Sequence, residues 1–361
     1  MKILALGATG AIGSQLAREL VRAGHELVVT SRHARPASAG LRYVQGNARD
    51  GEFLKGILRE HWDVVVDFMV HDTATFRAHR DMLLDATGQY VYLSSGRVFA
   101  QSDVPLTERS ARLLDLSTDA AFLATDEYAL AKARQEDLLR ASGRSNWTIV
   151  RPYITFGDAR FQLGTLEKET WLYRALKGRS IVFCGPMLKK WTTLTAGADV
   201  ARMIAALVGN SAALGEDFNL TARQAMTWGE VLELYLDELE AHLGHRPGVF
   251  LQDVESFCQA ANSVPQVRYD RMYDRRFDPS KVGALVDLDK VRDPRLALAA
   301  QFRVQLSGGG FLALNSRGEA LRDRAAREHA ALSEFQGLKR KISYLAYRNI
   351  PLGLIEKLRP S

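Results

Sequence analysis

The chain has 361 residues, 47% of them hydrophobic and 25% charged, so it can bury a sizeable core without a disulfide or a metal. Together with 28 glycines and 10 prolines, these values exclude collagen-like, disordered and disulfide-scaffold proteins. The formal net charge of +6 is concentrated in residues 336–361, which carry six basic side chains and one acidic side chain, so we expect no nucleic acid as a partner.

In the first 156 residues, short apolar runs alternate with stretches of helical periodicity. Apolar runs of this kind form strands buried on both faces, and helices between them are typical of a parallel sheet. The pattern predicts an α/β fold with a doubly wound parallel (Rossmann) sheet, followed by a smaller, mixed C-terminal domain. The expected strands are 2–6, 26–30, 42–46, 63–70, 90–95 and 148–156, and the expected helices are 11–23 and 52–60.

The pattern is looser beyond residue 156. We expect helices at 199–208 and 228–243, a strand at 218–222 and a strongly charged helix at 319–333. In the basic and apolar tail, Pro351 and Gly353 prevent one continuous helix. We expect the tail to pack against the chain or to form a dimer contact, and peripheral membrane contact is the less favoured alternative.

A glycine-rich turn directly follows the first expected strand and opens the first expected helix. In Gly7-Ala-Thr-Gly10-Ala-Ile-Gly13, the first glycine allows the tight turn, the second allows a pyrophosphate to approach the backbone, and the third allows close packing of the helix. Unpaired N–H groups at the helix N-terminus favour phosphate binding. We therefore predict a dinucleotide site that also includes Thr9, Ala11 and Ile12.

The end of the second expected strand bears on the choice of dinucleotide. Sites that prefer NAD place an acidic residue near this point to bind the ribose hydroxyls, whereas this strand ends in Ser31-Arg32. A guanidinium and a hydroxyl suit a 2′-phosphate. We predict that NADP(H) is preferred, with NAD(H) as the alternative.

Tyr128 and Lys132 are four residues apart in a helix-forming stretch, so both lie on one helical face. A nearby ammonium favours the phenolate and brings the tyrosine pKa, ordinarily about 10, toward the neutral range. Ser95 ends an apolar strand and could donate a hydrogen bond to the same substrate oxygen. We predict Ser95, Tyr128 and Lys132 as the catalytic residues.

With these motifs, the sequence resembles an extended short-chain dehydrogenase/reductase of the NAD-dependent epimerase/dehydratase family, over about residues 1–225. The matching segments are GATGAIG, GNARD, SSGRVF, YALAK, RPYITFG and TTLTAGADVA. The resemblance implies that Tyr128 exchanges a proton with a sugar hydroxyl or ketone, that Lys132 holds the nicotinamide ribose and that Ser95 orients the substrate oxygen. It further implies cofactor contacts from Asn47, Ala48, Phe68, Met69, Tyr128, Lys132 and Tyr153, and substrate contacts from Ser95, Gly96, Arg97, Ile154, Thr155 and Arg160.

Several positions depart from the family pattern. Asn47 replaces the usual Asp near the adenine, Asp67 stands where many members have His, and Ile154 replaces an Asn that usually contacts substrate. The 4,6-dehydratases carry Asp-Glu after their catalytic Thr or Ser, where this chain has Gly96-Arg97. Dehydration therefore lacks its acid and base, which leaves ketoreduction or epimerisation.

We expect an NAD(P)-dependent oxidoreductase or epimerase that acts on a nucleotide sugar and forms a homodimer, as relatives commonly do. One alternative is an NADPH-dependent reductase of a lipid-linked or polyketide ketone, and another is a non-catalytic dinucleotide- or RNA-binding protein of the same fold. The expected domains are a dinucleotide-binding domain at 1–165, a mainly substrate-binding region at 166–335 with some segments returning to the first domain, and the tail at 336–361.

The cysteines, the histidines and the apolar runs bear on metal binding and on the cellular compartment. The two cysteines, Cys184 and Cys258, form no C-x-x-C motif, and the eight histidines show no metal-ligand spacing, so we expect a reducing compartment and no metal. No apolar run approaches the roughly 18 residues of a membrane span. A glycine turn stands where a signal peptide would need its apolar segment. We therefore expect a cytoplasmic protein.

Overall fold

The computed structural model describes residues 1–157 and 160–357, which fold into two compact units. The first unit comprises Met1–Asp158, Thr193–Ala225 and Arg275–Ala297. The second unit comprises Ala159–Thr192, Met226–Asp274 and Leu298–Ser361. Among the described residues, no helix is both long and apolar enough to cross a bilayer.

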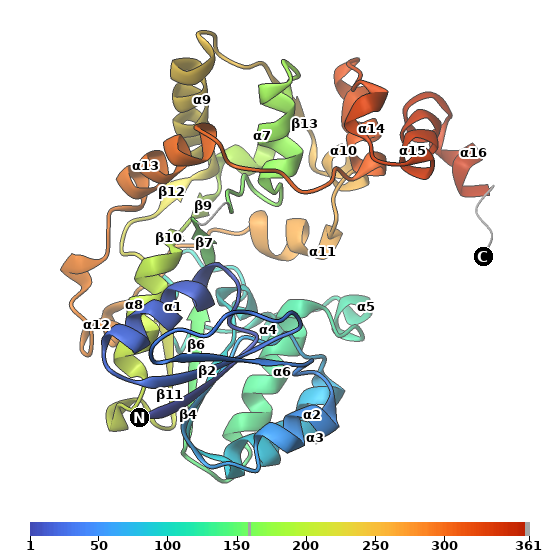
Figure 1. The fold of residues 1–361 in the computed structure, drawn as a ribbon. Coiled ribbons are helices and arrows are strands. Elements are labelled where there is room, and N and C mark those ends of the chain that lie inside the picture. Colours follow the sequence, from blue (N-terminus) through green and yellow to red (C-terminus); the bar gives the residue numbers. More distant parts are fainter. Residues whose placement is uncertain (158–159, 358–361) are drawn as a thin grey trace. The chain divides into compact units, whose positions relative to one another are not determined.

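A seven-stranded parallel sheet forms the centre of the first unit, with the order β11-β6-β5-β4-β1-β2-β3 (Figure 1). The chain winds outward in both directions from β1, so a crevice is expected beside the carboxyl ends of β1 and β4. This arrangement confirms the predicted doubly wound fold. The strands are β1 (Lys2–Leu6), β2 (Glu26–Ser31), β3 (Leu41–Gln45), β4 (Trp62–Asp67), β5 (Thr87–Leu93), β6 (Trp147–Pro152) and β11 (Glu216–Leu220).

Helices cover both faces of this sheet because its apolar strands are buried on both sides. On one face, α1 and α8 pack side chains such as Leu16 and Ile204 against Ile3 and Val29. On the other face, α2, α3 and α6 pack against the alternate strand residues. The helices of this unit are α1 (Ala11–Arg22), α2 (Gly51–Ile57), α3 (Thr73–Asp85), α4 (Leu113–Leu116), α5 (Ala120–Leu123), α6 (Tyr128–Arg140), α8 (Gly197–Leu207) and α12 (Ser280–Gly283), with 3₁₀ turns η1 (Gly96–Val98), η3 (Ser211–Ala213) and η5 (Leu288–Lys290).

Short strands and helices make up the remainder. In the first unit, β7 (Ile154–Phe156) pairs with β10 (Leu194–Ala196). In the second unit, β8 (Ile181–Cys184) pairs with β13 (Val249–Gln252), and β9 (Trp191–Thr192) pairs with β12 (Met226–Thr227). The other elements are α7 (Lys168–Leu176), η2 (Gly185–Lys189), α9 (Trp228–Leu243), α10 (Val254–Gln259), α11 (Val264–Gln266), the π-turn η4 (Val267–Arg271), α13 (Pro294–Leu306), α14 (Ser316–Ala326), η6 (Leu332–Glu334), α15 (Leu338–Asn349) and α16 (Leu352–Lys357).

The charged helix predicted at 319–333 is wrong at both ends. It begins at Ser316, capped by Asn315, and ends at Ala326 because Arg327 adopts a left-handed conformation with φ of 59°. Two of its acidic side chains are not solvated either. Glu319 and Asp323 are buried and both accept hydrogen bonds from Arg174 of α7.

Candidate active site

The glycine turn between β1 and α1 is shaped by three different local requirements. Gly7 has φ of +70° and donates its N–H to Thr30 Oγ1 at 2.9 Å. A Cβ on Gly13 would lie 2.6 Å from the backbone of Ala8, so only glycine allows this packing. A Cβ on Gly10 would meet no heavy atom within 4 Å. The turn is therefore open at Gly10, where α1 begins without a side-chain cap and can offer its first N–H groups to a phosphate.

Beside this turn lies a cavity of about 340 Å³ at the carboxyl ends of the central strands. Its lining contains two guanidinium groups, from Arg32 and Arg49, and no carboxylate. Eight predicted cofactor residues line it: Gly7, Thr9, Ser31, Arg32, Asn47, Ala48, Phe68 and Met69. Of its other lining residues, Val70 continues the cofactor-lining segment expected at Phe68 and Met69, whereas Thr30, Gly46 and Arg49 were missed by sequence reasoning.

Asp67, which replaces the family's histidine, anchors the segment after β4. Its buried carboxylate accepts hydrogen bonds from the Met69 N–H and the Tyr90 hydroxyl, both at 2.7 Å, and lies 3.1 Å from His71 Nε2. Burial acts to raise the pKa of Asp67, but the hydrogen bonds and charge of His71, with the other donors, lower it. Asp67 thereby fixes the backbone of Phe68 and Met69 against the cavity.

A second cavity, of about 360 Å³, shares Arg49 and Val70 with the first. Tyr128 and Lys132, two of the predicted catalytic residues, belong to its lining. The remaining lining residues are His71, Asp72, Thr75, Asp126 and Ala131. Because the two cavities adjoin, the glycine turn and the Tyr128–Lys132 pair flank one continuous region of the first unit.

Tyr128 is the first residue of α6 and lies between two cationic side chains. The Arg97 guanidinium lies 5.1 Å from the centre of the Tyr128 ring, and Lys132 Nζ lies 5.9 Å from it. Lys132 is buried and donates to the backbone oxygen of Leu93 at 2.6 Å. Burial lowers the pKa of Lys132 to about 8, although Asp67 and Glu136 partly oppose that shift. Two cationic groups therefore lie near the Tyr128 ring.

Arg97 also links Ser95 to Tyr128. Ser95 is buried, and its Oγ accepts a hydrogen bond from the Arg97 N–H at 3.2 Å. The Arg97 guanidinium is oriented by Glu127, which accepts from Nη2 at 2.6 Å and also caps α6. The predicted residues Ser95, Arg97 and Tyr128 are thus brought together by two short segments, η1 and the start of α6.

Four further predicted residues belong to the same unit as this group, and one belongs to the second unit. Gly96 packs closely on Phe277, because a Cβ there would lie 2.7 Å from Phe277 Cζ. The Tyr153 and Phe277 rings lie 5.1 Å apart, and Ile154 and Thr155 are buried in β7. Arg160 belongs to the second unit, where it pairs with Glu167 at 3.3 Å.

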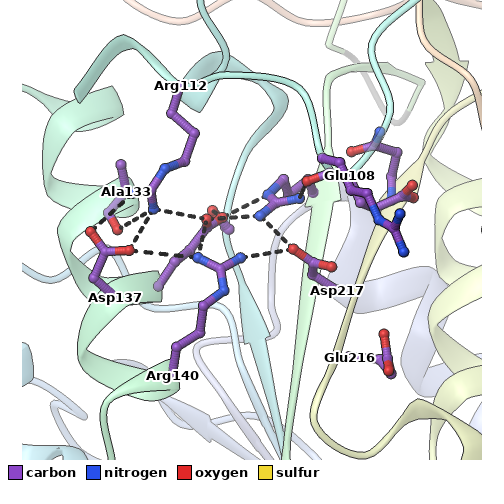
Figure 2. Close-up of polar contacts among 12 residues, drawn as sticks. Glu108, Arg112, Ala133, Asp137, Arg140, Glu216 and Asp217 are labelled. Carbon is purple, nitrogen blue, oxygen red and sulfur yellow. Dashed lines mark hydrogen bonds and ion pairs between the residues drawn. The ribbon is translucent and has the colours of Figure 1, made fainter. Parts of the chain in front are cut away.

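An ion-pair network holds α6 in place behind the site (Figure 2). Arg151 of β6 donates to Glu136 of α6 and also to Asp217 of β11 at 2.8 Å. Figure 2 shows Arg140 directed at the same Asp217 carboxylate, at 2.7 Å. Because Glu136 is one helical turn beyond Lys132, the network sets the position of the Tyr128–Lys132 face relative to the sheet.

Two curated proteins are similar to part of this sequence. The chain is 27% identical over 245 residues to the Arabidopsis thaliana "Chloroplast stem-loop binding protein of 41 kDa b", covering 63% of this chain and 60% of that one. It is 26% identical over 242 residues to the Streptomyces kanamyceticus 2'-dehydrokanamycin reductase, covering 64% and 65% of the two chains. The chain thus spans less than two thirds of the length of either relative.

Among solved structures, the Bacillus cereus UDP-glucuronic acid 4-epimerase, determined with UDP-glucuronic acid and NAD, superposes with a TM-score of 0.63. That likeness covers 85% of this chain and 100% of the epimerase at 16% identity, which establishes a shared fold. The sequence profile of the NAD dependent epimerase/dehydratase family matches residues 3–221 and confirms the resemblance drawn from the motifs. The chain belongs to the NAD-dependent epimerase/dehydratase family of extended short-chain dehydrogenases/reductases.

Proposed function

We propose that this protein is an NADP(H)-preferring oxidoreductase that reduces or epimerises a sugar carbon of a nucleotide sugar, with Tyr128 as the acid/base. The observation that carries the proposal is the position of Tyr128, between the cations of Arg97 and Lys132 and in a cavity adjoining the glycine turn. An isolated phenol is a poor base at neutral pH because its pKa is about 10. Two neighbouring cations would lower this pKa by stabilising the phenolate.

The cavity beside the turn suits a dinucleotide. Gly10 leaves the backbone open to a pyrophosphate, and the lining of Phe68, Met69 and Ala48 is compatible with an adenine. Arg32 and Arg49, with no carboxylate among the lining residues, favour a 2′-phosphate over a free ribose hydroxyl. A bound nicotinamide supplies or accepts the hydride in this family's chemistry.

The chain's own residues would divide the proton chemistry among them. Tyr128 donates a proton to the substrate oxygen during reduction and removes it during oxidation, while Lys132 stabilises the phenolate. With a pKa of about 8, Lys132 remains mostly protonated at neutral pH. Ser95 orients the substrate oxygen, and Arg97 adds positive charge beside the phenol.

A second candidate is NADPH-dependent reduction of a carbonyl that carries no nucleotide. Ile154 is buried where the family usually has a substrate-contacting Asn, and one relative is named as a reductase of 2'-dehydrokanamycin. Calorimetry with UDP, dTDP, GDP and CDP separates the two, because a nucleotide-sugar enzyme should bind one of them preferentially. If none binds while NADPH does, the second candidate replaces the first.

The test of either reading is Tyr128→Phe, compared with Tyr43→Phe, which removes a hydroxyl from β3 outside both cavities. We expect kcat to fall roughly 100- to 10,000-fold in Tyr128→Phe with NADP(H) affinity retained, and no change in the control. Unaltered turnover in Tyr128→Phe would remove Tyr128 as the acid/base.

RNA binding by a protein that shows no dinucleotide binding would favour the non-catalytic alternative. Light scattering tests the homodimer expected from the sequence resemblance.

A further inference from the structure

The helix α15 carries an apolar stripe that faces away from the core of its unit. Leu338, Ile342 and Leu345 are spaced four and three residues apart and therefore share one helical face. Their exposed fractions are 72%, 57% and 43%. Ile350 and Leu354, in the turn and helix that follow, are 38% and 53% exposed and extend the apolar surface. Most apolar side chains of this size are buried in a folded protein, so a run of five calls for a partner.

The opposite face fixes how α15 is oriented. Tyr344 and Tyr347 are buried, and Tyr344 stacks on Phe335 with ring centres 4.6 Å apart. The Tyr344 hydroxyl donates to Asp323 of α14 at 2.6 Å and accepts from the Ala330 N–H at 2.7 Å. Since these contacts hold α15 from one side, the helix cannot roll inward to bury its stripe.

Positive charge borders this stripe. Lys341 and Arg348 lie along one edge of it on the helical wheel, and Lys339 lies along the other. The segment 335–355 contains these residues and Arg340 but no Asp or Glu. Within the described part of the chain, Lys339, Arg340 and Lys341 form no salt bridge. An apolar face with basic edges and no acidic residue is the pattern of a helix that lies in the headgroup region of an anionic bilayer.

We propose that the outer face of α15, continued by Ile350 and Leu354, docks the protein onto an anionic lipid surface. The leucine and isoleucine side chains would enter the boundary between headgroups and acyl chains, and Lys339 and Lys341 would lie at the lipid phosphates. Self-association through the stripe fits less well, because two copies of α15 would bring cations together with no acidic side chain between them. This inference does not depend on the catalytic proposal.

The test is co-sedimentation of the full chain with vesicles of phosphatidylcholine alone and of phosphatidylcholine mixed with phosphatidylglycerol. We expect binding to the anionic vesicles only, weakened by added salt. Lys339→Gln/Lys341→Gln should lower the partition coefficient roughly 30-fold, about fivefold for each charge. Leu338→Ser/Ile342→Ser/Leu345→Ser should abolish binding while cofactor affinity and the near-ultraviolet circular dichroism stay unchanged.

The matched control is Val304→Ser on α13. Val304 is 75% exposed, but its neighbour Arg303 is already paired with Glu238 at 2.6 Å. This variant should bind vesicles as the unaltered protein does. Failure of the unaltered protein to bind anionic vesicles at low salt would overturn the proposal, as would equal binding by the triple serine variant. A dimer that becomes monomeric in the triple variant, without vesicle binding, would assign the stripe to self-association instead.

Discussion

The guanidinium of Arg151 and the carboxylate of Glu136 form two hydrogen bonds, of 2.7 and 2.8 Å, with both side chains almost completely excluded from water. This pair joins β6 to the helix that carries Tyr128 and Lys132. Breaking a buried pair leaves an unpaired charge, whereas replacing both partners with apolar residues costs much less. We therefore expect Arg151→Met to lower the free energy of unfolding by about 3–5 kcal/mol in urea titrations. The double variant Arg151→Met/Glu136→Met should recover part of this loss, and additive losses would contradict the coupling.

The same pair predicts how stability responds to acid. Burial acts to raise the pKa of Glu136, but the charge and hydrogen bonds of Arg151, assisted by Arg140 and Ser94, lower it. A carboxyl whose pKa is lower in the folded state stabilises the fold above its unfolded pKa of about 4.3, and that stabilisation is lost as pH falls further. The unfolding free energy should therefore decline more steeply below about pH 4.5 in the natural protein than in Glu136→Gln. Parallel pH profiles would show that the pair contributes nothing to acid sensitivity.

Lys132 is predicted to lower the stability of the fold while being required for turnover. Its pKa is lowered by burial to about 8, so near neutral pH the folded state must keep a charge that burial disfavours. Replacing it in Lys132→Met should abolish turnover and remove a destabilisation of up to about 3 kcal/mol near pH 7. Because Lys132 loses its proton more readily in the folded than in the unfolded chain, the difference between the two proteins should shrink as pH rises from about 8 to 10. Urea titrations from about pH 7 to 10, in the absence of cofactor, measure this difference in the free energy of unfolding.

Replacing two glycines of the turn by alanine should affect different properties, stability at Gly13 and dinucleotide binding at Gly10. A Cβ on Gly13 would overlap the backbone of Ala8, so Gly13→Ala should destabilise the protein by about 1–3 kcal/mol. Gly10→Ala meets no atom within 4 Å and should change stability by less than about 1 kcal/mol, yet weaken dinucleotide binding. Thermal unfolding and fluorescence titration with NADPH separate these effects. Undiminished NADPH affinity in Gly10→Ala would place the pyrophosphate elsewhere.

The cofactor preference is expected to reside in Arg32 and Arg49. Neutralising either one in Arg32→Gln or Arg49→Gln should raise the Kd for NADPH roughly tenfold to a hundredfold, because a hydrogen bond to a charged group contributes about 1.5–3 kcal/mol. The Kd for NADH should stay nearly constant. Arg35→Gln, which removes an exposed arginine outside the cavity lining, is the matched control. Equal losses for both dinucleotides would indicate a contact with a phosphate that they share.

Local patterns were sufficient to predict the first unit's framework. The apolar run at 2–6, the glycine turn and the helix at 11–23 agree with β1 and α1 to within one residue, because each is determined by neighbours in sequence. Arg49 was missed because an exposed arginine in a turn has no periodicity to mark it. Phe277 covers Gly96 across 181 positions of sequence, and no local pattern could predict such a pairing. The buried Arg174–Asp323 pair was likewise hidden, since charge alone suggests a solvated helix.

The three-segment composition of the first unit has a consequence for synthesis on the ribosome. When β6 has emerged, its outer edge has no partner until β11, which begins at Glu216. At typical elongation rates, the nascent sheet keeps that edge unpaired for about 3–14 seconds, with its backbone N–H and C=O groups available to other chains. Phe277 arrives later still, so Gly96 is covered only after residue 277 has been made. Newly made copies should therefore benefit from a chaperone bound during this interval, whereas the completed fold should not need one.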